Sequence, residues 1–151
     1  MTDKAEWEVV PNSAIGPLRL RTTRAELDSA IGEQSERHMA PTGYPIELRY
    51  SVLGVAVSLD GSGIAREIEV SEPANPTLAG KPLLGVGIGE ALRRLTRAGC
   101  VGTMRDSHSI DAEACGIRLW LPDGVVASVV VFDIEDKPPK VSTAELLSRL
   151  G

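Results

Sequence analysis

Apolar residues at every second position mark a first β-hairpin between residues 54 and 70. Its outgoing strand is apolar at alternate positions, namely Leu53, Val55, Val57 and Leu59. Period-two alternation places such residues on one face of a strand. The turn at residues 60–63 contains two glycines and tolerates positive φ, as a tight reversal requires. The return strand places Ile64, Ile68 and Val70 on the apolar face, with Arg66 as its one polar member, and Ala65, Glu67 and Glu69 on the other face.

A second hairpin, residues 116–132, repeats this pattern. Ile117, Leu119 and Leu121 alternate with Arg118 and Trp120, and Pro122-Asp123-Gly124 forms the turn. The return segment, Val125 to Phe132, is almost wholly apolar, which predicts a strand that is covered on both faces or has one face committed to a partner. Two such similar hairpins in a short chain indicate an internal duplication.

Helix signals precede each hairpin. Thr23 and Glu26 form a capping box, and Gly32 ends the predicted helix in the left-handed conformation. In the second half, residues 89–97 predict a helix that stops at Gly99. Ser142 predicts the start of a third, short helix over residues 142–150.

The order strand, helix, loop and hairpin therefore recurs at a spacing of about sixty residues. We predict a single domain over residues 1–151, made of two repeats at about 7–72 and 80–134 and the C-terminal helix 142–150. The predicted fold class is α+β, a tandem repeat of strand, helix and antiparallel hairpin whose sheet has the helices packed on one face. The other face is expected to be exposed and curved. The polar segments 33–44 and 101–114 are interpreted as loops.

Composition narrows the function and the compartment. The chain of 151 residues has a net charge of −5, which argues against general nucleic-acid binding. The N-terminal segment shows no signal-peptide pattern, and no apolar run approaches the roughly twenty residues of a membrane span. We therefore expect a cytoplasmic protein without membrane or nucleic-acid partners. In that compartment Cys100 and Cys115 are expected to be free thiols, whereas an exported chain would pair them.

Three patterns invite a chemical reading, and each has a simpler structural one. Residues 85–89 have the form Gly-x-Gly-x-Gly before a helix. The dinucleotide fingerprint is Gly-x-Gly-x-x-Gly, so its last glycine would have to stand at position 90, where the chain has Glu90. Residues 106–109 bring an acid, hydroxyls and an imidazole together in sequence, whereas a catalytic triad assembles in space. Cys100, His108 and Cys115 fit no zinc spacing. We predict no catalytic residues, no cofactor and no metal.

Trp120 is the most informative single residue. The alternation places it with Arg118 on the face opposite the apolar set, and Trp and Arg are the residue types that most often anchor protein interfaces. Glu67 and Glu69 lie on the corresponding face of the first hairpin, and Asp123 lies in the second hairpin turn. The predicted partner-binding residues are Trp120, Arg118, Glu67, Glu69 and Asp123.

The layout resembles that of small, internally duplicated bacterial inhibitor and immunity proteins, including the tandem-repeat β-lactamase inhibitor proteins. The resemblance rests on Thr23-Arg24-Ala25-Glu26 with Gly32, and on Gly89-Glu90 with Gly99 as a weaker second copy. It implies a binding protein without catalytic residues. The β-lactamase inhibitors are exported and disulfide-bonded, whereas this chain shows neither a signal peptide nor matching cysteine pairs.

The leading hypothesis is therefore an immunity protein, or antitoxin, that occludes the active site of a toxin or enzyme domain and is itself a monomer or weak dimer. A second hypothesis is a small-ligand binder or enzyme with a cleft between the repeats, into which His38 and His108 converge. A third is an assembly subunit that dimerises through Val125–Phe132.

Overall fold

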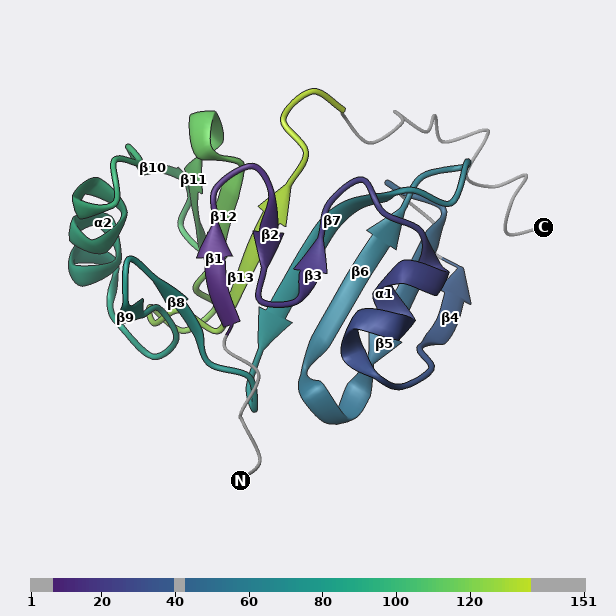
Figure 1. Cartoon of the computed structure of the whole chain (residues 1–151). Coiled ribbons are helices and arrows are strands. Elements are labelled where there is room, and N and C mark those ends of the chain that lie inside the picture. The colour runs from purple at the N-terminus through teal and green to yellow at the C-terminus, as the bar shows by residue number, and fades with distance from the viewer. Residues whose placement is uncertain (1–6, 40–42, 137–151) are drawn as a thin grey trace.

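Two β-sheets dominate the chain, which the computed structural model describes at residues 7–39 and 43–136 (Figure 1). In these residues one sheet has five strands and the other has eight, strand content is 43%, and there are only two α-helices. The predicted fold class, α+β with helices packed on one face of the sheet, is therefore wrong. The predicted helix 142–150 lies outside the described residues.

The elements follow one another in an order that nearly repeats. The first series is β1 (Trp7–Val10), β2 (Ala14–Ile15), β3 (Leu18–Arg19), α1 (Arg24–Ile31), β4 (Glu36–Met39), β5 (Ile46–Tyr50), the 3₁₀ turn η1 (Ser51–Leu53), β6 (Val55–Leu59) and β7 (Ala65–Ser71). The second series is β8 (Pro76–Leu78), β9 (Lys81–Pro82), α2 (Ile88–Arg97), β10 (Thr103–Asp106), β11 (Ser109–Ala112), η2 (Glu113–Cys115), β12 (Ile117–Trp120) and β13 (Ser128–Phe132).

The eight-stranded sheet is symmetric about its centre, with the order β10-β11-β12-β13-β7-β6-β5-β4. Each half is an antiparallel four-stranded meander, and the halves join where β7 pairs with β13. Val70 and Val131 hold equivalent places in their hairpins, opposite Val55 and Ile117 respectively. Ile68 and Val129 are likewise equivalent, since each lies two residues earlier. At the junction Val70 pairs with Val129, and Val131 pairs with Ile68. Exchanging the two repeats therefore leaves the pairing unchanged.

The turn before each hairpin is also the same. Gly54 and Gly116 follow the 3₁₀ turns with φ of 71° and 63°. Each carbonyl accepts a 2.8 Å hydrogen bond from the end of the return strand, from Ser71 N–H and Phe132 N–H respectively. A Cβ atom at Gly116 would lie 2.5 Å from the Phe132 carbonyl oxygen, and one at Gly54 would meet the Glu72 carbonyl. Glycine is required at both places.

The core lies between the two sheets. The five-stranded sheet, in the order β3-β2-β1-β8-β9, contributes buried residues such as Val9, Ile15 and Leu18. The inward face of the large sheet contributes the alternating residues that the sequence pattern marked, among them Val57 and Leu119, which are fully buried. The helices add Leu27, Ala91 and Leu95.

The fold class was wrong because short polar strands leave no apolar signal. Strand β4 lies in the segment 33–44 and β10 in the segment 101–114, both interpreted from the sequence as loops, and they form the two edges of the large sheet. None of the four residues of β10 is buried, and the same is true of β4. An edge strand exposed on both faces has no alternation to detect. The two- and three-residue strands of the smaller sheet are too short to show a period.

The predicted ends of the first helix are confirmed. Thr23 is the N-cap of α1, its side chain and that of Glu26 form the capping box, and Gly32 follows the helix with φ of 84°. Helix α2 starts at Ile88 with Gly87 as an N-cap that offers no side-chain hydrogen bond.

Arg66 does not lie in the apolar register as predicted. The β6–β7 pairing shifts after Ser58, so that Ala65 pairs with Leu59 and is fully buried. This bulge frees Arg66 to form ion pairs of 2.8 Å with Asp60 and with the buried Asp133. A period-two count cannot detect a bulge, which adds one residue to one strand.

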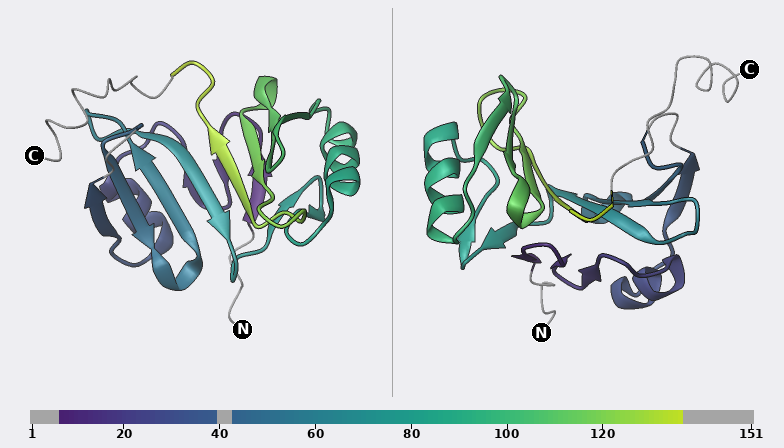
Figure 2. Two further views of the ribbon diagram at one scale, coloured as in Figure 1. Left: turned by 180° about the vertical axis from the view of Figure 1, so that it is seen from behind. Right: turned by 90° about the horizontal axis from the view of Figure 1, so that it is seen from above.

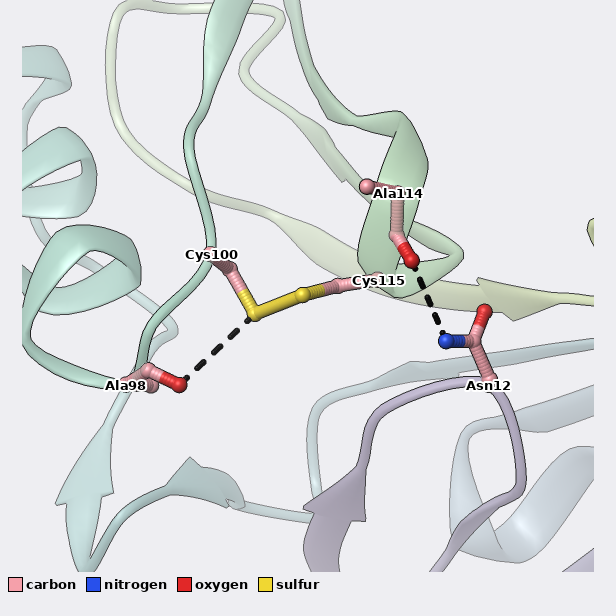
Figure 3. The surroundings of a disulfide bond; sticks show 5 residues. All are labelled: Asn12, Ala98, Cys100, Ala114 and Cys115. Carbon is pink, nitrogen blue, oxygen red and sulfur yellow. Dashed lines mark hydrogen bonds between the residues drawn. A yellow bond between two sulfur atoms is a disulfide. The ribbon is translucent and has the colours of Figure 1, made fainter.

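Cys100 and Cys115 form a disulfide, so the expectation of free thiols is wrong (Figure 3). The bond joins the segment after α2 to the turn η2, and the Cα atoms are 5.9 Å apart. Asn12, in the turn after β1, holds the other side of η2: its backbone N–H donates to Cys115 O at 2.8 Å and its side-chain amide to Ala114 O at 3.1 Å. The disulfide therefore belongs to a chain of contacts that runs into the smaller sheet.

Candidate protein-binding surface

The large sheet is curved, and its ends turn away from the smaller sheet and both helices (Figure 2, right). We call the resulting outer surface the concave face. It carries the alternate residues of β4–β7 and β10–β13 that do not enter the core. Burial raises the pKa of Glu67 on β7, and the positive charge of Arg105 on β10 opposes this rise.

Trp120 stands on the concave face at the end of β12 and is 43% exposed. Its neighbours on the adjacent strands are Ser109 and Ser128, and Ser71 follows on β7. The ring of His108 lies 6.0 Å from the indole, edge to face. Because these flanking serines are small, they leave the large indole accessible to solvent. An accessible tryptophan among small side chains is typical of a residue that anchors a protein interface.

Arg118 lies on the same strand and the same face but is held by neighbours. Its Nε atom donates to Asp111 at 2.8 Å, and its guanidinium lies 5.2 Å from the centre of the Phe132 ring. These contacts fix a cation over an aromatic ring. The Arg118 side chain is therefore held in one orientation by Asp111 and Phe132 while it remains on the surface.

Glu67 and Glu69 project from β7 onto the concave face, near the centre of the sheet. Glu69 pairs across strands with Val130 and accepts a 2.8 Å hydrogen bond from Ser128 Oγ. Glu67 lies opposite Phe132. Partial burial raises the pKa of Glu67 above its ordinary value; Arg118 opposes the shift and the Glu69 charge adds to it. The free protein thus holds two like charges close together on a partly dry surface.

Four of the predicted residues, Trp120, Arg118, Glu67 and Glu69, therefore share one surface. Asp123 lies apart from the strand positions, in the exposed turn between β12 and β13. The sequence interpretation missed Phe132, His108 and Arg105 as members of this surface. Phe132 follows Val130 at period two, so the alternation itself could have placed it there.

The alternative sites do not assemble. His38 lies on β4 and His108 beside β10, which are opposite edges of the large sheet, so they do not converge (Figure 1). Asp106 accepts hydrogen bonds from His108 N and Ser109 Oγ, at 2.7 and 3.0 Å, and thereby shapes a turn. Within residues 7–39 and 43–136 no three His, Cys, Asp or Glu side chains gather as a metal site requires.

Strand β13 lies inside the sheet and pairs with both β12 and β7. The third hypothesis, dimerisation through Val125–Phe132, therefore has no free strand edge to use. In the part of the chain that the structure describes, no helix has the length and apolar character needed to cross a membrane.

Comparison with protein-family models, with curated proteins and with solved structures found no match. The resemblance to immunity and inhibitor proteins therefore stays a prediction.

Proposed function

We propose that this chain is a non-enzymatic inhibitor that binds a toxin or enzyme domain through the concave face of its large sheet and occludes the active site of that domain. The observation that carries the proposal is the exposed Trp120 at the end of β12, on a curved sheet face that also holds Arg118, Phe132, Glu67 and Glu69. Interface hot spots combine an accessible Trp or Arg with neighbours that exclude water.

The asymmetry between the repeats supports the same conclusion. The equivalents of Trp120 and Arg118 in the first repeat are Ser58 and Ala56, which are small and partly buried. Folding needs no aromatic residue at this position, because the first repeat forms the same meander without one. This asymmetry supports a role for the Trp120 side chain in binding.

Substitution of the anchor tests the proposal. The tagged chain is used to recover its partner from the native host, and the dissociation constant and the partner's activity in the complex are measured. Trp120→Ala should weaken the complex by about 2 kcal/mol, roughly 30-fold, since a hot-spot indole loses its buried area. Val52→Ala is the matched control, because Val52 is 81% exposed and lies in the turn η1. Unchanged affinity of a folded Trp120→Ala variant, or full partner activity in the complex, would refute the proposal.

The disulfide bears on where this binding takes place. Such bonds persist in oxidising compartments and are rare in the cytoplasm. The disulfide therefore supports an oxidising compartment as the alternative to the expected cytoplasmic location. Labelling with a thiol reagent after rapid quenching of native cells tests the compartment. Cys100 and Cys115 should stay unlabelled if they are bonded in the cell. Full labelling would contradict an oxidising compartment.

A further inference from the structure

The charges on the concave face are unevenly balanced. Two of its carboxylates have a cationic neighbour, because Asp111 pairs with Arg118 at 2.8 Å and Glu47 pairs with Arg49. A third, Glu36, lies 3.5 Å from the imidazole of His38. Glu67 and Glu69, by contrast, form no ion pair within 4.0 Å among the described residues. The charges of Arg118 and Arg105 act on Glu67 only from a longer distance, and Glu69 accepts a neutral hydrogen bond from Ser128 Oγ. They are two positions apart on β7 and therefore point to the same side of the sheet.

This pair occupies the centre of the surface. Glu69 lies opposite Val130, in the middle of the β7–β13 pairing that joins the two repeats. Glu67 lies next to the aromatic ring of Phe132. An added positive charge here would relieve the repulsion between the two carboxylates in a region that is partly shielded from water, where an ion pair is stronger than at a fully exposed rim.

We propose that the partner segment bound by this face is basic, and that it places a lysine or arginine side chain against Glu67 and Glu69 at the junction of the repeats. This inference rests on the proposed function and specifies the chemistry of its partner. A nucleic acid is disfavoured, because its phosphates would meet these unpaired carboxylates. A second copy of the chain is disfavoured as well, because the centres of two identical acidic faces would repel one another.

A peptide titration tests the charge requirement without knowledge of the partner. The ¹⁵N-labelled protein is titrated with acetylated tetra-arginine amide and, separately, with acetylated tetra-citrulline amide, which is nearly isosteric but uncharged. The arginine peptide should shift the backbone amides of β7, β12 and β13 selectively, and the citrulline peptide should not. Equal binding of both peptides, or arginine-induced shifts spread over the whole surface, would overturn the inference.

Matched charge removals locate the site. The double variant Glu67→Gln/Glu69→Gln should weaken arginine-peptide binding by about tenfold, because it removes both unpaired carboxylates. The control Glu36→Gln/Glu47→Gln removes the same number of charges from the same face, but Glu47 already pairs with Arg49 and Glu36 lies beside the imidazole of His38, away from the centre of the sheet. It should change the affinity by less than about twofold. The opposite ranking of the two variants would place the cation elsewhere.

Failure of this inference can be told apart from failure of the proposed function. If Trp120→Ala weakens the partner complex while Glu67→Gln/Glu69→Gln leaves peptide and partner binding intact, the inhibitor proposal stands and the basic-partner inference falls. If the arginine peptide binds at Glu67 and Glu69 but Trp120→Ala leaves the partner complex intact, only the inhibitor proposal falls.

Discussion

The two repeats have the same order of elements, but different interactions connect the helix region to the large sheet in each. In the first, Arg24 on α1 donates to Ser35 Oγ and Ser35 O at 3.0 and 2.7 Å, while Asp28 accepts from Ser35 N at 3.2 Å and from Tyr50 Oη at 2.5 Å. We call these four residues the polar clamp. In the second repeat the segment after α2 is fixed by Cys100–Cys115.

The equivalent positions explain how each solution fits. Tyr50 ends β5 and its counterpart at the end of β11 is Ala112, while Leu53 in the first 3₁₀ turn corresponds to Cys115. In the first repeat the Tyr50 hydroxyl donates to Asp28 on α1. In the second repeat Ala112 is too small to reach the helix, and the Cys100–Cys115 disulfide makes the connection instead. The comparison teaches that the meander requires a tie between helix and sheet but does not dictate its chemistry.

Breaking the disulfide should have the largest effect. Reduction, or Cys100→Ser with Cys115→Ser, opens a loop of 15 residues. We expect a loss of about 3 kcal/mol in the free energy of unfolding, because the unfolded chain regains the entropy of that loop. Urea unfolding with and without reductant measures it.

Hydrogen exchange localises this effect. On reduction, amides of β10 and β11 should exchange faster, because their hairpin lies within the opened loop, while amides of β4 and β5 serve as the internal control. Equal acceleration in both hairpins would mean that the disulfide stabilises the whole chain rather than one repeat.

The polar clamp should come next. Asp28→Asn should cost about 2 kcal/mol, since it weakens hydrogen bonds to a charged acceptor. Tyr50→Phe removes one of the same hydrogen bonds, so the effects of the two substitutions should not add, and a double-mutant cycle by urea unfolding checks this. Additive effects would show that Asp28 and Tyr50 act independently.

The clamp should also respond to pH, and the disulfide should not. Burial raises the pKa of Asp28, but hydrogen bonds from Tyr50 and Ser35 outweigh it and leave the pKa below its ordinary value. The carboxylate therefore stabilises the fold at pH values above the unfolded pKa, and this contribution is lost as the pH falls through the folded pKa. The stability difference between wild type and Asp28→Asn should shrink between about pH 5 and about pH 3. A constant difference over that range would contradict it.

The helix caps offer the smallest test. Thr23→Ala removes the capping box of α1 and should cost about 1 kcal/mol. Gly87→Ser adds a side-chain acceptor to α2 and should gain a few tenths of a kcal/mol, since Gly87 has extended backbone angles and open space for a Cβ. Thermal unfolding compares them. A destabilising Gly87→Ser would indicate that the glycine is needed for another reason.

The hairpins and the first helix were predictable because their signals are local. Alternation identified β6 and β12, and the capping box with Gly32 gave the ends of α1. The edge strands β4 and β10 were not predictable, because their mostly polar and exposed residues show no alternation, and they become strands by pairing with β5 and β11. The Cys100–Cys115 bond was not predictable either, because its closure depends on how α2 and η2 meet in space.

The candidate surface was predictable in part for the same reason. The period-two alternation alone placed Trp120 and Arg118 on the outer face of the second hairpin, and Glu67 and Glu69 on the outer face of the first. That all four share a surface depends on the pairing of β7 with β13, and no local pattern specifies which strands of two hairpins will join.

The sequence by itself determined which residues form hairpins, where the first helix begins and ends, and which side chains cannot enter the core, because each depends on neighbours within a few positions. Only the tertiary structure decided the strand order, the curvature of the large sheet, the polar clamp and the disulfide. Those features join residues far apart in the chain, and their energies arise from contacts that exist only after the two repeats have paired.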